Sequence, residues 1–316
     1  MLKKRLLLLV MIFTFSAILI GFVLKVSGNE KPKVVVVLKD LDTQYWEIVK
    51  GGAEKGFRDF NIDGKIVAPS YQSEEETQEE LLPKILKENP DLLIISPIGS
   101  TVIPMLKEFV KKDIPVLLLD TNDPWEGKTA YIGTDNLNLG RKAGALLASE
   151  LQPGDEVAII AGDISVSPIK ERVAGAKASL EGAGIKIATE KLKLPNEPLP
   201  VKKEMREILQ TNPNVKGVFA TTDIMAVSAL EAIKEQGYHM PVIGADGIIE
   251  MIELIKEGTL TGTVAQNPYD MGYIGVETAL KVLNGKKVEK NIDSGVDIIT
   301  EDNAAQKLEF LEKLLR

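Results

Sequence analysis

Four polar residues follow three short apolar runs between residues 217 and 272, at the points where strands would end. They are Thr222, Asp223, Asp246 and Gln266. Hydroxyl, carboxylate and amide groups form directional hydrogen bonds with polar ligands. None of the four is a nucleophile paired with a base. The combination therefore predicts a binding site for a small polar ligand.

Helical patterns separate these apolar runs, and strands that alternate with helices predict a parallel sheet. The ligands of such sheets bind beyond the carboxyl ends of the strands. The same alternation begins at the apolar run Val34–Leu38 and restarts after Pro153-Gly154. One predicted helix, which ends at Glu88, would open with a capping box at Ser73–Glu76. We predict an α/β fold of two doubly wound parallel-sheet lobes that face each other across a cleft.

The composition excludes several classes of function. The chain has 316 residues, of which 44% are hydrophobic, and this length suffices for two separate cores. A net charge of −8 disfavours nucleic acid as a partner, because an acidic body repels phosphates. Cysteine is absent and His239 is the only histidine, which excludes thiolate zinc sites, cysteine nucleophiles and histidine-dependent triads. We predict no metal site and no cofactor.

The N-terminus predicts export. Met1–Arg5 is basic, and Leu6–Leu24 is a run of nineteen uncharged residues. As a helix this run would be roughly 28 Å long, close to the hydrocarbon thickness of a membrane. Its exit, Val23–Gly28, is a poor match to a signal-peptide cleavage site. We favour an uncleaved anchor, residues 6–24, over a removed signal peptide; both place the body outside the cytoplasm.

Several short motifs occur in a recognisable order and spacing. They are Tyr45-Trp46, Leu118-Leu119-Asp120, Gly133-Thr134-Asp135-Asn136, Glu171-Arg172, Val218-Phe219-Ala220 with Asp223, Gly244-Ala245-Asp246-Gly247, and Ala265-Gln266 with Pro268. With this set the chain resembles the periplasmic sugar-binding proteins of the ribose/galactose type, which share their core with LacI-type repressors. The resemblance covers roughly residues 33 to 300. Each motif is weak by itself, and their order makes the set specific.

The resemblance implies two lobes joined by three crossovers that act as a hinge and close on the ligand. The crossovers would lie near Thr134–Asn136, Gln266–Asn267 and Ile292–Gly295. Residues 31–135 and 267–292 would form the N-terminal lobe, and residues 136–266 and 293–316 the C-terminal lobe. Residues 1–30 would be the signal or anchor helix and its linker.

The resemblance also implies binding positions. Tyr45 and Trp46 match aromatic residues that sandwich a sugar ring, whose C–H face packs on such side chains. Asp120 matches a carboxylate that accepts hydrogen bonds from sugar hydroxyls. Arg172 matches an arginine that clamps ring or hydroxyl oxygens.

Further positions lie in the second lobe and the hinge. Asp246 and Gln266 match polar anchors there, and Thr222 stands where relatives often have asparagine. Two departures leave the identity of the sugar open. Thr121 follows Asp120 where ribose-type proteins have arginine, and Lys39 replaces a small polar residue. A lysine here is also similar to binding proteins for the quorum signal autoinducer-2.

Some of these residues have simpler interpretations. Trp46 lies on the apolar stripe of its predicted helix and could be part of the core. Asp223 could be the N-cap of the following helix. Lys39 begins a loop, where lysines are usually solvated.

The predicted function is binding of a monosaccharide outside the cytoplasm and its presentation to an ABC-type sugar permease. One alternative is a membrane-anchored sensor that signals to a histidine kinase, as in some xylose-sensing relatives; another is binding of an autoinducer-2-type ligand. A DNA-binding repressor would need a helix-turn-helix headpiece before residue 33, where the apolar run lies instead. No nucleophile elbow, P-loop or dinucleotide fingerprint is present, so we predict no enzyme.

Overall fold

A computed structural model describes residues 31–69 and 77–315. It contains two sheets, and the first forms the centre of the N-terminal lobe. Its strand order is β11-β5-β4-β3-β1-β2, and all neighbouring strands are parallel. The strands are β1 (Lys33–Val37), β2 (Asp63–Val67), β3 (Leu92–Ile95), β4 (Val116–Leu119), β5 (Ala130–Gly133) and β11 (Asn291–Asp293).

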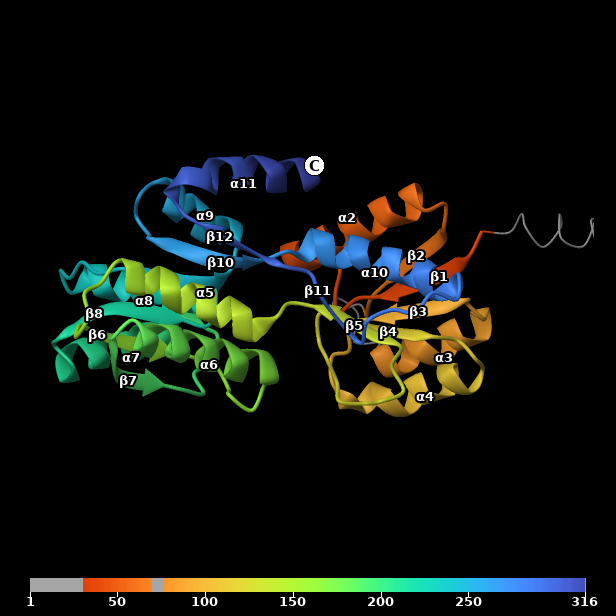
Figure 1. Cartoon of the computed structure of the whole chain (residues 1–316), viewed down its shortest axis with the longest axis horizontal. Helices are drawn as coiled ribbons and strands as arrows, with labels where there is room; N and C mark the ends of the chain where they lie inside the picture. The colour runs from red at the N-terminus through yellow and green to blue at the C-terminus, as the bar shows by residue number, and fades with distance from the viewer. Residues whose placement is uncertain (1–30, 70–76, 316) are drawn as a thin grey trace, which may run out of the picture.

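Helices cover both faces of this sheet (Figure 1). One face carries α2 (Gln44–Asp59) and α10 (Pro268–Leu283); the other carries α3 (Gln78–Glu88), the short η1 (Ser100–Val102) and α4 (Ile103–Lys111). After Lys33, strand β1 is apolar because Val34 and Val36 join the core under α2 and α10, whereas Val35 and Val37 join the core under α3 and α4.

The second sheet builds the C-terminal lobe in the same way. Its order is β12-β10-β9-β8-β6-β7, and only the edge pair β10–β12 is antiparallel. The strands are β6 (Glu156–Ile160), β7 (Lys186–Lys191), β8 (Val215–Ala220), β9 (Val242–Asp246), β10 (Gly262–Gln266) and β12 (Val296–Ile299). The helices are α5 (Asn136–Ser149) and α6 (Ser167–Gly182) on one face, and α7 (Pro198–Thr211), α8 (Asp223–Glu235), α9 (Ile249–Lys256) and α11 (Glu301–Leu314) on the other.

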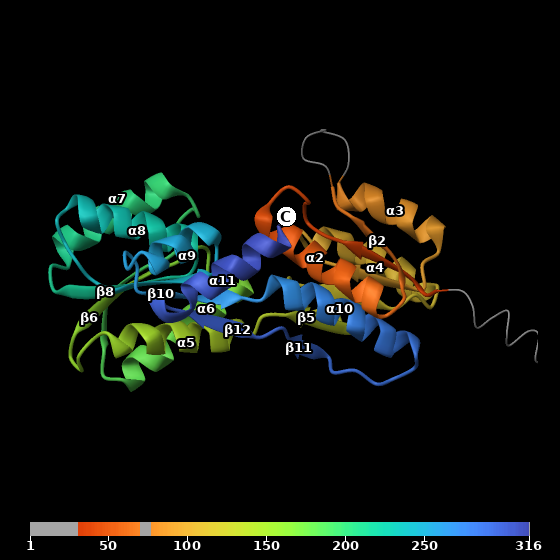
Figure 2. The ribbon, with the colours of Figure 1, turned by 90° about the horizontal axis from the view of Figure 1, so that it is seen from above.

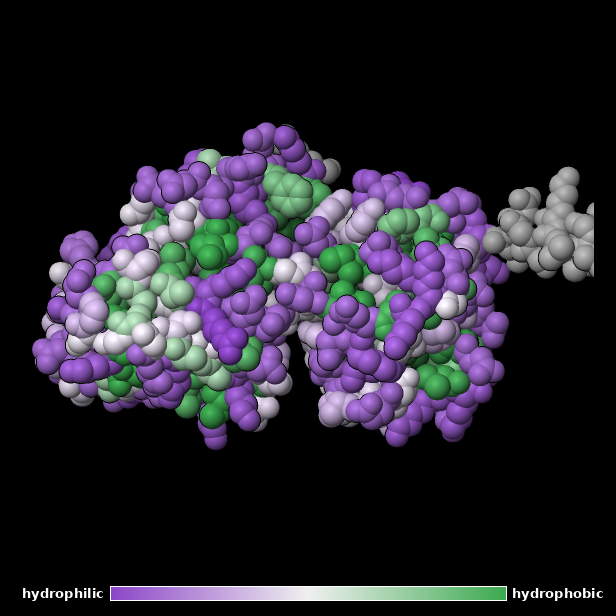
Figure 3. Space-filling model, viewed as in Figure 1, coloured by the Kyte–Doolittle hydropathy of each residue, from purple (hydrophilic) through white to green (hydrophobic). Residues whose placement is uncertain are grey.

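Three short connections join the lobes. The chain passes from β5 to α5, from β10 to α10, and from β11 to β12. In Figure 2 all three cross at the same side of the molecule, and Figure 3 shows the surface indented between the lobes. The predicted fold class, two doubly wound lobes joined by three crossovers, is confirmed. The residue boundaries of the lobes remain a prediction.

Two local expectations differ from the structure. The capping box predicted at Ser73–Glu76 lies outside the described residues. Helix α3 begins at Gln78 instead, and the Glu80 carboxylate accepts a hydrogen bond from the Thr77 backbone N–H at 2.9 Å. In the part of the chain that is described, no helix has the length and apolar character to span a membrane. The predicted anchor, residues 6–24, lies outside that part.

Helices α2 and α10 approach closely because glycines remove side chains at their contact. A Cβ on Gly52 would overlap the backbone carbonyl of Tyr269. We expect Gly52→Ala to lower the free energy of unfolding by about 3 kcal/mol, because backbone cannot yield as a side chain can. Urea titration of the full-length chain measures this change.

The neighbouring Gly51 is the matched control, since a Cβ there would meet nothing within 4 Å. We expect Gly51→Ala to raise the free energy of unfolding by about 0.5–1 kcal/mol, because alanine favours helix over glycine. Equal effects of the two substitutions would contradict the close approach of the helices.

Candidate functional site

Two carboxylates sit at the carboxyl ends of central strands, one in each lobe, on unusual backbone. Asp120 directly follows β4 with φ +61°, and Asp246 ends β9 with φ +130°. Positive φ is uncommon for residues other than glycine and costs about 1–3 kcal/mol. Such strained positions cluster at functional sites. Asn61, Asn89, Asp113 and Lys193 also have positive φ, so the position at the end of a central strand, and not φ alone, marks the two aspartates as the centre of a candidate site.

In the N-terminal lobe, the side chains of Lys39, Tyr45 and Thr121 contact Asp120, and the Thr121 hydroxyl donates to Asp120 Oδ2 at 2.9 Å. Lys39 Nζ lies 2.9 Å from Asp120 Oδ2 and donates to Thr121 Oγ1 at 2.6 Å. The Tyr45 hydroxyl donates to Asp120 Oδ1 at 2.8 Å. The Lys39 and Asp120 side chains are 27% and 15% exposed, so a ligand can still reach them. The predicted residues Lys39, Tyr45 and Asp120 thus form one group.

In the C-terminal lobe, Arg172 holds Asp246. Arg172 Nη1 lies 2.9 Å from Asp246 Oδ1 and donates to the Thr221 carbonyl at 2.8 Å. Its Nε donates to Asn136 Oδ1 at 2.9 Å. The arginine side chain is only 5% exposed. Three acceptors therefore fix the buried guanidinium before any ligand arrives.

The hinge links the two groups. Gln266 Nε2 donates to Asp246 Oδ1 at 2.8 Å, and its Oε1 accepts from Thr134 Oγ1 at 2.9 Å. The Tyr45 hydroxyl lies 3.5 Å from the same Oε1. We call the resulting row of side chains the polar chain; its members are Lys39, Asp120, Tyr45, Gln266, Asp246 and Arg172. The polar chain runs from one lobe to the other.

Tyr45 lies at the middle of the polar chain and is protonated at neutral pH. Burial, and then the negative charge of Asp120, raise the pKa of the Tyr45 hydroxyl well above its ordinary value. The phenol is therefore a hydrogen-bond donor to the carboxylate, and its ring forms part of the wall of the site.

Trp46 and Thr222 are not members of the polar chain, although the Trp46 ring contacts two of its members. Trp46 is 6% exposed and packs in the core under α2. Its ring meets Tyr45 edge-on at 5.0 Å, and Lys39 Nζ lies 5.4 Å from its centroid. Thr222 is the N-cap of α8, accepting from Met225 N at 3.3 Å, and it donates to Asn196 Oδ1 at 2.7 Å.

Asp223 positions the loop that carries Asp246. Its Oδ2 accepts from the backbone N–H groups of Gly247 at 2.5 Å and Ile248 at 2.9 Å, and its Oδ1 accepts from Thr263 Oγ1 at 2.6 Å. Asp223 is fully buried. Asp223 is the first residue of α8, so the N-cap is Thr222 and not Asp223, which the sequence offered as a possible N-cap. Burial, and then the charge of Asp246, raise the pKa of Asp223 to about 7.

Three partners of the polar chain were not among the predicted binding residues. Thr134 contacts Gln266 and Asn136 contacts Arg172. Thr134 and Asn136 lie in the Gly133–Asn136 motif at the first crossover, and this position in the motif could have identified them from the sequence. Thr121 was noted only as a departure from the family pattern, although its hydroxyl accepts from Lys39. A residue that supports a binding group is harder to identify from sequence than the group itself.

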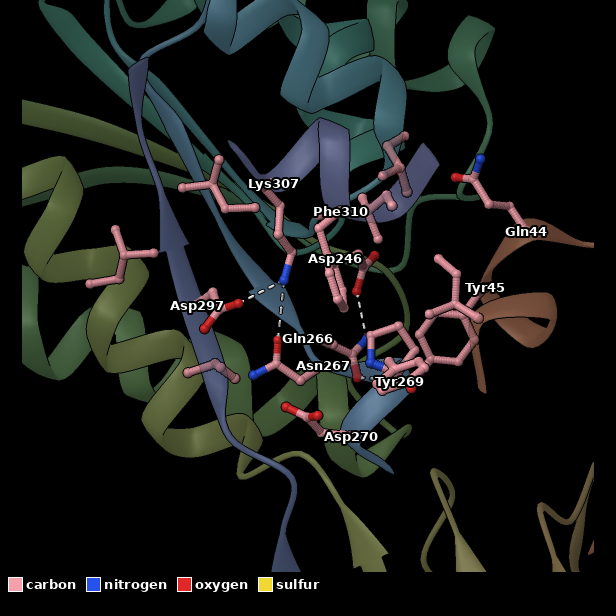
Figure 4. Close-up of a pocket in the computed structure, with 18 of the residues that line it drawn as sticks. Gln44, Tyr45, Asp246, Gln266, Asn267, Tyr269, Asp270, Asp297, Lys307 and Phe310 are labelled. Carbon is pink, nitrogen blue, oxygen red and sulfur yellow. Dashed lines mark hydrogen bonds and ion pairs between the residues drawn. The ribbon is translucent and has the colours of Figure 1, made fainter. Parts of the chain in front are cut away.

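A cavity of about 880 Å³ adjoins the polar chain. Tyr45, Asp246 and Gln266 line it together with residues of β12, α10 and α11 (Figure 4). Lys39, Asp120 and Arg172 are not part of its lining. The cavity therefore lies to one side of the polar chain, next to the hinge.

Comparison with known proteins places the chain in a family. A family model described as a periplasmic binding protein domain matches residues 34–287. The chain belongs to the periplasmic binding protein family. This match confirms the resemblance that the motifs indicated, and it covers both lobes of the binding protein.

Curated relatives align along nearly their whole length. The ribose import binding protein of Bacillus subtilis is 29% identical over 287 residues, which are 87% of this binding protein and 90% of the relative. The D-allose-binding periplasmic protein of Escherichia coli is 28% identical and covers 87% and 92%.

Solved structures share the fold. The binding protein resembles a periplasmic ribose ABC transporter protein from Conexibacter woesei with a TM-score of 0.83, at 23% identity, over 88% of this chain and 95% of that chain. A periplasmic solute-binding protein from Actinobacillus succinogenes with bound D-allose gives a TM-score of 0.76 at 26% identity, over 87% and 100%.

Proposed function

We propose that this binding protein holds one monosaccharide between its lobes, outside the cytoplasm, and presents the closed form to an ABC-type sugar transporter. The polar chain is the observation that carries the proposal. It sets carboxylates, a lysine, an arginine, a phenol and an amide side by side across both lobes. Sugar hydroxyls donate and accept at neighbouring atoms, so they match such an alternating row.

The charges of the polar chain favour a neutral ligand. Lys39 compensates Asp120, and Arg172 compensates Asp246. An anionic or cationic ligand would add a charge without a counter-charge to a partly buried site, which is costly. Both hydrogen bonds that Asp246 receives from Arg172 and Gln266 go to Oδ1. We assign Oδ2 of Asp246 to a ligand hydroxyl.

The names of the relatives support transport. The B. subtilis and E. coli proteins above are binding proteins for ribose import and for D-allose. Neither of these named relatives favours the sensor-kinase alternative or the autoinducer-2 alternative. Export and anchoring through residues 6–24 are part of the proposal and rest on the sequence of the N-terminus.

The direct test of the proposal is a ligand panel. We expect the thermal midpoint of the full-length chain to rise with the concentration of one pentose or hexose, because a ligand at 100 times its Kd adds about 2.7 kcal/mol to the stability of the folded state. The panel contains ribose, allose, arabinose, xylose, glucose, galactose, inositols and autoinducer-2. A flat response to every sugar would contradict the proposal.

Removal of the Tyr45 hydroxyl should weaken the binding of that sugar. Tyr45→Phe keeps the ring but loses the hydrogen bond to Asp120, so we expect about a tenfold higher Kd, equivalent to about 1.4 kcal/mol. Isothermal titration calorimetry measures the change. Tyr238→Phe, at a tyrosine that is exposed and remote from the polar chain, is the control and should bind as the native chain does. If Tyr45→Phe and Tyr238→Phe bound the sugar with equal affinity, the Tyr45 hydroxyl would not be part of the binding site.

A further inference from the structure

Helix α11 forms a roof beside the hinge. It packs against α9 and β12 of its own lobe and reaches α2 of the other lobe. The rings of Phe310 on α11 and Tyr269 on α10 meet edge-on, 5.9 Å apart. Ile48 of α2 is buried in the same apolar cluster as Leu308 and Leu311. Both views show the C-terminal end of α11 reaching the junction of the lobes (Figures 1 and 2).

The cavity of about 880 Å³ lies beneath this roof, and we call it the hinge chamber. Its volume is near the upper end of the roughly 300–1,000 Å³ that drug-sized ligands occupy, and one sugar ring is much smaller than such a ligand. A single monosaccharide on the polar chain would therefore leave most of the hinge chamber unused.

The walls of the hinge chamber suit a second sugar ring. Tyr269 and Phe310 offer aromatic faces, and Gln306 of α11 offers an amide, whereas the Asn303 amide is engaged in the capping box of α11. Lys307 Nζ lies 2.6 Å from Asp297 Oδ2, so this pair is charge-compensated, as the pairs of the polar chain are. Figure 4 shows Lys307 and Tyr45 on opposite sides of the space. Aromatic faces with amide and paired charged groups at the edges are the surfaces that bind carbohydrate.

The hinge chamber is continuous with the polar chain. Tyr45, Asp246 and Gln266 belong to both. Residues of the second crossover, Asn267 and Pro268, also line the chamber. In a hinge rotation, points beside the pivot move least. We therefore expect closure of the lobes to change the far side of the cleft more than the hinge chamber.

From this geometry we infer that the binding protein takes a disaccharide, with one ring on the polar chain and the second ring in the hinge chamber. The inference rests on the proposed sugar-binding function and names a larger ligand for the same site. The first ring uses Asp120, Asp246 and Arg172. The second ring packs on Phe310 and Tyr269 and hydrogen bonds with the Gln306 amide of α11.

Calorimetry on the full-length chain tests the inference with ribose, allose, glucose and galactose beside maltose, cellobiose, lactose and trehalose. We expect at least one disaccharide to bind tenfold more tightly than either of its monosaccharides. Phe310→Ala and Gln306→Ala should each remove most of that advantage and leave monosaccharide affinity unchanged. Both side chains are exposed, so these variants should fold. Leu199→Ala, at a remote side chain that is 80% exposed, is the control.

The outcomes separate the inference from the proposed function. If monosaccharides bind and no disaccharide binds more tightly, the inference is wrong and the proposed function stands. If a disaccharide binds more tightly but neither α11 variant affects it, the second ring is not in the hinge chamber, and the inference is wrong. If no sugar of either size binds, the proposed function fails, and the inference fails with it.

Discussion

Replacement of Arg172 by alanine is expected to abolish sugar binding and to lower the free energy of unfolding by about 3–5 kcal/mol. Arg172 is buried, and its loss leaves the amide oxygen of Asn136 and the carbonyl of Thr221 without this donor and the Asp246 carboxylate without its counter-charge, held by Gln266 alone. The sugar affinity should fall at least about 100-fold, which is equivalent to about 2.7 kcal/mol of binding free energy. Urea titration and calorimetry measure the two effects.

Arg206→Ala is the matched control for this prediction. Arg206 pairs with Glu235 at 2.6 Å on the surface, where the two side chains are 43% and 47% exposed. Its loss should cost less than about 1 kcal/mol and leave sugar affinity unchanged. Arg172→Lys keeps the positive charge but not the planar group that reaches three acceptors, so it should also bind poorly. Native affinity in Arg172→Ala would show that the site lies elsewhere.

The stability of the binding protein should fall as the pH rises from about 4 to about 7, because of Asp223. Its pKa is raised from 3.8 to about 7 in the folded chain. Between these values the folded state binds more protons than the unfolded state, so the free energy of unfolding decreases with pH, by up to about 1.4 kcal/mol per pH unit. This loss of stability is complete above about pH 7 and absent below about pH 4. Its total is up to about 4 kcal/mol.

Asp223→Asn should remove this dependence and keep the local structure. One carboxylate oxygen accepts both backbone N–H groups, and an amide oxygen can do the same, while the amide nitrogen can donate to Thr263. We expect Asp223→Asn to unfold at a higher urea concentration than the native chain at pH 8. Asp155→Asn, at a carboxylate whose pKa is lowered, should retain the native slope between pH 5 and 8. The same slope in Asp223→Asn would contradict the assignment.

The sequence predicts the fold well because its parallel strands are buried on both faces. Side chains of strand β1 pack alternately into two cores, so the run Val34–Leu38 is apolar without alternation. Such runs are easy to recognise between helical patterns. Strand β11 was not predicted. It has three residues, Asn291–Asp293, of which only Ile292 is apolar, and its pairing with β5 depends on tertiary structure.

The polar chain was predictable for a similar reason. Asp120, Asp246 and Gln266 occur at strand ends, where topology brings side chains from distant segments together. Thr222 also lies at a strand end, yet it caps α8 and pairs with Asn196. Position along a strand alone does not decide between a cap and a binding group, because both need the same kind of oxygen.

The hinge chamber could not be predicted from the sequence. The amphipathic pattern over residues 303–315 is typical of a helix, but it does not indicate the surface on which that helix packs. The contact between Phe310 and Tyr269 joins segments that lie in different lobes. Periodicity identifies an apolar face, and only the assembled lobes show that this face covers a space beside the hinge.

The most direct test of the account is the distance between the lobes with and without sugar. The chain has no cysteine, so Lys87→Cys on α3 and Lys203→Cys on α7 give a unique pair of spin-label sites on exposed residues. Helices α3 and α7 adjoin the strands β2 and β7, at the edges farthest from the hinge. We predict that the sugar that raises the thermal midpoint also shortens the distance between the labels. A bound sugar with an unchanged distance would contradict closure of the lobes on the ligand.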